Sequence, residues 1–83
     1  MHERALMRDL LDRVEAVASA ESAARVTRVV VRVGPLSHFT PAHFREHFAD
    51  AARGTVADGA EVDVSIDADG GDVLLESLEL EVA

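Results

Sequence analysis

The 83-residue chain contains no cysteine, tryptophan or tyrosine, and its only aromatic residues are three phenylalanines. Without cysteine the chain can form no disulfide bond, no thiolate metal site and no thiol nucleophile, which fits a cytoplasmic location. The core must therefore consist mainly of aliphatic side chains. At this length it is a single small core, near the lower limit of what holds a domain together.

Basic residues are also scarce, because 8 Lys and Arg stand against 16 Asp and Glu and give a net charge of −8. Nucleic acids and anionic membranes are bound through basic patches, so neither is expected as a partner. No apolar run approaches the length of a transmembrane helix. Glu3 and Arg4 stand where a signal peptide would need its apolar segment, and we therefore expect a cytoplasmic protein.

The centre of the expected fold is the stretch from Arg25 to Val33, which is rich in β-branched residues and stops at Gly34-Pro35. This composition predicts a strand. Side chains alternate across a strand, so one face is apolar and the other is basic and hydrated. The first face carries Thr27, Val29, Val31 and Val33, and the second carries Arg28, Val30 and Arg32.

Two helices are predicted from apolar residues at helical spacing. The first runs from residue 3 to about residue 20, and its apolar stripe consists of Leu6, Met7, Leu10, Leu11, Val14, Val17 and Ala18. Thr40-Pro41 predicts the start of the second helix, which runs to about Arg53 and ends at Gly54. Its apolar face comprises Phe44, Phe48, Ala51 and Ala52.

Two further strands are predicted in the C-terminal part of the chain. In the stretch 61–66 the apolar residues are Val62, Val64 and Ile66. In the stretch 72–82 they are Leu74, Leu78, Leu80 and Val82, with Glu76 as an exception on that face. The residues between the strands, 67–71, read Asp-Ala-Asp-Gly-Gly and resemble part of a calcium-binding loop. They lack its distal glutamate, so we interpret them as a plain hairpin turn.

These elements predict an α+β fold in two layers with the topology α-β-α-β-β. A mixed three-stranded sheet carries two helices on one face and water on the other. Arg28 and Arg32 of the first strand complement Glu79 and Glu81 of the third strand. Because opposite charges favour neighbouring strands, we expect the strand order 1-3-2, with the third strand in the middle. The second helix then supplies the crossover between parallel strands one and two.

Histidine supplies the only side chains that stand out as transition-metal ligands. His43 and His47 are four residues apart on one helix and can chelate a metal from the same side. No third ligand stands nearby in the sequence, so we interpret them as a solvated surface pair. His38 is no stronger candidate for a metal ligand. His2 differs because an α-amine precedes it and backbone amides follow, a nitrogen-rich set that suits Ni(II) or Cu(II). By chemistry alone, an exposed side chain remains the favoured interpretation of His2.

A series of short motifs is distributed along essentially the whole chain. They are Met1-His2-Glu3, Leu6-Met7-Arg8, Val26-Thr27-Arg28-Val29, Val33-Gly34-Pro35-Leu36-Ser37, Arg53-Gly54-Thr55, Gly59-Ala60-Glu61 and Leu75-Glu76-Ser77-Leu78-Glu79-Leu80-Glu81. In this order they resemble the HypA/HybF family of nickel chaperones for hydrogenase maturation.

The resemblance implies that Met1 (through its amine), His2 and Glu3 bind Ni(II). It also implies that the nickel passes to the precursor of a nickel enzyme with help from a GTPase partner. The function so implied is that of a nickel metallochaperone and not of an enzyme. The alternative is a metal-free protein-interaction module that retains the family fold.

One feature departs from the family pattern. The family carries a zinc ribbon with two pairs of cysteines between its second and third strands, whereas here residues 67–71 take its place and no cysteine remains. We therefore expect residues 1–83 to form a single nickel-binding domain without structural zinc.

Overall fold

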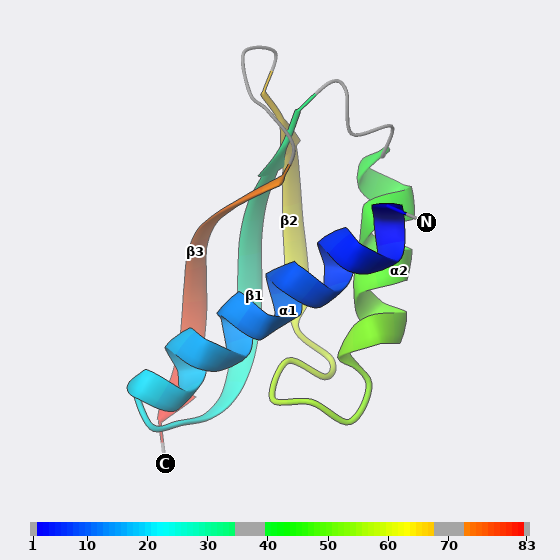
Figure 1. Cartoon of the computed structure of the whole chain (residues 1–83). Helices are drawn as coiled ribbons and strands as arrows, with labels where there is room; N and C mark the ends of the chain where they lie inside the picture. Colours follow the sequence, from blue (N-terminus) through cyan, green and yellow to red (C-terminus); the bar gives the residue numbers. More distant parts are fainter. Residues whose placement is uncertain (1, 35–39, 68–72, 83) are drawn as a thin grey trace.

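The computed structural model describes residues 2–34, 40–67 and 73–82, which form two helices and three strands (Figure 1). The elements are α1 (His2–Ala20), β1 (Ala23–Val33), α2 (Pro41–Ala52), β2 (Glu61–Ile66) and β3 (Val73–Val82). This order confirms the predicted topology α-β-α-β-β. Both helices cover the same face of the sheet, as predicted (Figure 1).

The core lies between this face of the sheet and the two helices. Its fully buried large side chains are Phe44, Phe48, Val14, Val26, Val29, Val31 and Val33. No polar or charged side chain of the described residues is buried, so the apolar area removed from water dominates the stability of the domain. Two predicted core residues lie at the edge of their helical stripes and are exposed: Val17 and Ala51. Ala18, one turn after Val14, takes the inward position instead.

Local capping sets the position of α2. The Thr40 side chain accepts a hydrogen bond from the His43 backbone N–H at 3.1 Å, and Pro41 follows at the start of the helix. This arrangement confirms the predicted N-cap. The helix ends at Ala52, one residue before the predicted end, and Gly54 follows with a φ of +76°, a conformation that glycine adopts at little cost. Within the described ranges neither helix has the length and hydrophobicity needed to span a bilayer.

The central strand is β1, so the predicted order 1-3-2 is wrong. The sheet has the order β2-β1-β3, in which β1 is parallel to β2 and antiparallel to β3. The predicted β1–β3 pairing is therefore confirmed, but within the described strands β2 lies on the other side of β1 and does not pair with β3. Residues 68–72, which hold most of the predicted turn, lie outside the described residues.

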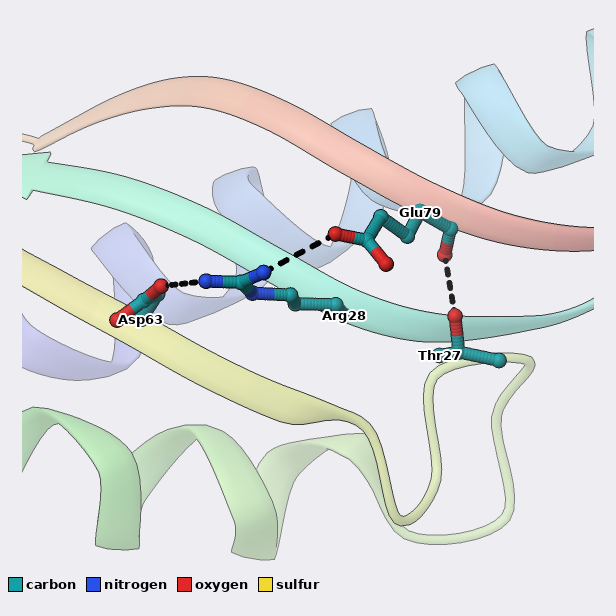
Figure 2. Close-up of polar contacts among 4 residues, drawn as sticks. All are labelled: Thr27, Arg28, Asp63 and Glu79. Carbon is teal, nitrogen blue, oxygen red and sulfur yellow. Dashed lines mark hydrogen bonds and ion pairs between the residues drawn. The ribbon is translucent and has the colours of Figure 1, made fainter.

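Charges on the outer face of the sheet explain this order (Figure 2). The Arg28 guanidinium pairs with Asp63 of β2 on one side and with Glu79 Oε2 of β3, at 3.1 Å, on the other. The hydrogen bond that Arg28 donates to Asp63 is the largest cause that raises the pKa of Arg28 above its usual value, followed by the charge of Asp63. The predicted order would have placed the acidic outer face of β2 directly beside that of β3. A basic strand between two acidic strands avoids this repulsion.

A bulge at Thr27 shifts which side chains of β1 face the core. Val26 stands opposite Leu80 and Arg28 opposite Glu79, so Thr27 is an extra residue in β1. Its hydroxyl donates to the Glu79 carbonyl oxygen at 3.1 Å (Figure 2). Val26 is 1% exposed, whereas Thr27 is half-buried, so the prediction that Thr27 shares the buried face is wrong.

A second bulge explains the misplaced Glu76 of β3. Val30 stands opposite Ser77 and Val31 opposite Leu75, which leaves Glu76 as the extra residue. Beyond it the alternation of β3 changes phase, so Leu75 packs against the core while Leu74 is 55% exposed. The predicted inward position of Leu74 is therefore wrong. Glu76 instead accepts a hydrogen bond from Arg32 Nε at 2.6 Å on the outer face.

Candidate functional site

The N-terminal end of α1 carries the residues that the sequence marks as metal ligands. Met1 lies outside the described residues, as do the side chains of His2 and Glu3, so their role as ligands stays a prediction. The backbone of His2 and Glu3 forms the start of α1. The first four N–H groups of an α-helix have no carbonyl partner within the helix. A metal can therefore take the backbone nitrogens of His2 and Glu3 without the loss of an intrahelical hydrogen bond.

The first described side chains of α1 lie at the edge of the packed part of the molecule. Among the described side chains of α1, Met7 is the first that is buried, Leu6 packs partly against the core, and Ala5 is exposed. The helix contacts α2, and Figure 1 shows that its N-terminal end is the part beside α2. The predicted ligands thus belong to a chain end next to a second helix.

A second set of nitrogen donors lies on α2. The Nε2 atoms of His43 and His47 are 2.7 Å apart, and the ring centroids are 4.4 Å apart with an interplanar angle of 62°. At this distance one ring donates a hydrogen bond to the other. The prediction that both imidazoles face the same side is confirmed. The interpretation as two merely solvated side chains missed the contact between the rings, which the i, i+4 spacing permits but does not require.

Arginines pair with acidic side chains on the outer face of the sheet. Besides the pairs of Arg28, Arg25 lies 3.5 Å from Glu81 and Arg32 bridges Glu76 and Asp67. No three His, Cys, Asp or Glu side chains gather as a metal site within the described parts of the chain. The outer face is therefore a network of charges that holds the strands in register. His38 lies outside the described residues.

Comparison with known proteins agrees with the motifs in the sequence. A family model described as "Hydrogenase/urease nickel incorporation, metallochaperone, hypA" matches residues 1–69. The hydrogenase maturation factor HypA of Chlorobium limicola is 41% identical over 64 residues, which are 77% of this chain and 55% of that protein. The HypA protein of Archaeoglobus fulgidus is 34% identical over 67 residues, which are 81% of this chain and 61% of that protein.

The chain therefore spans little more than half the length of the curated relatives it matches. A solved structure has the same fold. It is the solution structure of the Ni metallochaperone HypA from Helicobacter pylori, with a TM-score of 0.81 over 98% of both chains at 18% sequence identity.

Proposed function

The chain belongs to the HypA family, and from this membership we propose that it binds Ni(II) at its N-terminus and delivers it to a nickel enzyme such as a hydrogenase. The observation that carries the proposal is the Met1-His2-Glu3 segment, which lies inside the matched residues 1–69 and whose His2 begins α1. Nickel is the cargo of such a protein and not a structural part of it.

The proposed ligands are the Met1 amine, the His2 imidazole, the intervening backbone nitrogen and a contribution from Glu3. Nitrogen-rich tetragonal ligation suits Ni(II) better than it suits the hard cations Ca(II) or Mg(II). Metal binding requires that the amine and the imidazole give up their protons, and both groups titrate near neutral pH. The net charge of −8 attracts a divalent cation at long range.

A nickel site at the N-terminal end of the chain suits a protein that transfers nickel better than one that stores it. The proposed ligands precede Met7, the first buried side chain among those described in α1, so release of nickel should leave the rest of the domain folded. We propose a GTPase and the precursor of the nickel enzyme as partners, and the cytoplasm as the place of exchange, because these belong to the family's role. Neither a nucleic acid nor a membrane is part of the proposal.

Isothermal titration calorimetry of the untagged protein with Ni(II) tests the proposal. We expect His2→Ala, and separately a short N-terminal extension that moves the chain amine away from His2, to weaken nickel binding by at least about tenfold, or ~1.4 kcal/mol. The circular dichroism spectrum should remain unchanged, because the buried core of the described residues includes no residue before Met7.

The matched control is His43→Gln with His47→Gln, which keeps His2 and the chain amine. It should retain the N-terminal nickel site. In a chain that also carries His43→Gln and His47→Gln, nickel binding that survives both N-terminal changes would overturn the proposed site. An untagged protein that binds no nickel would favour the metal-free interaction module.

A further inference from the structure

We propose that His43 and His47 form a second metal site, on α2, for a late first-row divalent ion such as Ni(II), Cu(II) or Zn(II). The two imidazoles converge on one point above the helix, where their Nε2 atoms lie 2.7 Å apart. Its two ligands belong to α2, and the proposal does not rest on the proposed N-terminal function.

The distance between the two nitrogens is close to what one metal ion needs. With metal–nitrogen bonds of about 2.0–2.1 Å, two ligands of the same ion stand ~2.9 Å apart at a right angle and ~3.4 Å apart at a tetrahedral angle. The rings must therefore part by only a few tenths of an ångström, which small rotations of the two side chains provide. The ion then occupies the place of the hydrogen bond.

The hydrogen bond between the rings already leaves one of the two nitrogens without a proton. In the pair, one Nε2 carries the proton and the other accepts it, so the accepting nitrogen already has the protonation state of a ligand. When the ion binds, the proton between the rings leaves its Nε2. It moves to Nδ1 of the same ring. Each neutral imidazole then carries its single proton on Nδ1, and the total number of protons is unchanged.

The helix beneath the pair is held firmly, which lowers the entropy that binding must remove. Phe44 and Phe48, the residues that directly follow the two histidines, are 0% and 1% exposed. The Thr40 hydroxyl fixes the backbone of His43 at the N-terminus of the helix. A pair of ligands that is already in place loses little conformational freedom when it binds a metal.

The surroundings determine which ion fits and how completely the protein encloses it. Imidazole suits Zn(II), Cu(II) and Ni(II), whereas Ca(II) and Mg(II) prefer oxygen ligands. His43 is exposed and His47 is half-buried, so the ion can approach from solvent. The described residues bring no third His, Cys, Asp or Glu side chain to the pair. Ligands beyond this pair, such as water, complete the coordination.

The test uses the full chain with the His2→Ala change and an N-terminal extension, so that the chain-end site is disabled. Titration with ZnCl2, followed by NMR, should shift the imidazole signals of His43 and His47 at one ion per chain. Saturating Zn(II) should raise the melting temperature by ~5 °C or more, because the ion binds the folded helix better than the unfolded chain. Titration with NiCl2 should give the same stoichiometry.

The matched control keeps the number of histidines and destroys only their spacing. His47→Gln with Arg45→His places the two imidazoles two residues apart, where they point to different sides of the helix. We expect this variant and the single His47→Gln variant to lose both the NMR shift and the rise in melting temperature. Retention of both effects in the displaced pair, or their absence in the protein with the intact pair, overturns the site. In a chain with an intact N-terminus, His43→Gln with His47→Gln reports separately on the chain-end site.

Discussion

The inner face of β1 and the N-terminal end of α1 differ in what they require: the first must be buried to stabilise the fold, and the second must be accessible to bind a metal. Val29, Val31 and Val33 on β1 are completely buried and carry no group that can exchange a proton or bind an ion. The start of α1 carries an imidazole, and among the described side chains of that helix the first buried one is Met7. The domain thus separates the residues that stabilise its fold from those proposed to bind its cargo.

This separation has a physical cause. A metal ligand must lose its proton, meet an ion from solvent and later release it, and burial in a core opposes each of these steps. The paired histidines of α2 show the same arrangement within one helix, because Phe44 and Phe48 anchor it while the adjacent His43 and His47 face outward. Changes to the core should therefore abolish folding, and changes to the nitrogen donors should alter metal binding alone.

The largest effect should follow from Val31→Asp, which places a carboxylate in the core without a partner. Burial of an unpaired charge costs several kcal/mol, which is comparable to the total of about 4–12 kcal/mol that a domain of this size has. We expect loss of the cooperative thermal transition by circular dichroism. The same change one residue earlier, Val30→Asp, lies on the half-exposed face between Arg28 and Arg32 and should leave the domain folded. Equal effects at the two positions would contradict the assignment of the strand faces.

A smaller effect should follow from Arg28→Glu, which tests the position of β1 between two acidic strands. The change places three carboxylates together, because Asp63 and Glu79 flank position 28. We expect the melting temperature to fall at low salt and to recover in part at high salt, where the repulsion is screened. Asp63→Lys in the same chain should restore much of the loss. In the order 1-3-2, β2 would lie away from position 28 and the second change would give no rescue.

The sequence predicts those parts of the fold that are encoded within one element. The start of α2 follows from Thr40-Pro41, and the buried stripe of α1 follows from helical spacing, because caps and amphipathic faces depend on neighbouring residues. The order of the strands depends on the charges of all three strands. The expected order took account of the attraction between β1 and β3 but not of the repulsion between the acidic faces of β2 and β3. The acidic residues Asp63 and Glu79 in fact provided the signal for a central β1.

Bulges and the metal sites depend on geometry that spacing alone does not determine. Glu76 stood out on an otherwise apolar face of β3, which was the visible sign of a change in phase, whereas Thr27 gave no such sign. The same limit applies to the histidines of α2, whose spacing predicts a shared face but not a 2.7 Å approach of two nitrogens. The residues of the N-terminal site come from a family resemblance, and their arrangement around nickel remains a proposal.

A modest effect should follow from Thr27→Val, which removes the hydroxyl that bonds to the Glu79 carbonyl across the bulge. A hydrogen bond of this kind contributes about 0.5–1.5 kcal/mol, so we expect a loss of that size in the free energy of unfolding measured with urea. The sign of the effect distinguishes two structures. In a regular strand Thr27 would face the core, and its replacement by valine would stabilise the domain.

The smallest effect should come from removal of metal. Protein prepared without added metal should keep its melting temperature within ~1 °C after treatment with a chelator. A zinc ribbon couples folding to metal binding through cysteine ligands, which this chain lacks. Its 83 residues include no cysteine, and its core is apolar throughout the described residues. Elemental analysis should find no stoichiometric zinc. Added Ni(II) should then raise the melting temperature, because an ion that binds the folded state stabilises it even where folding does not need the ion. Release of one tightly held zinc together with unfolding would contradict this expectation, because it would place a metal site within the region that stabilises the fold.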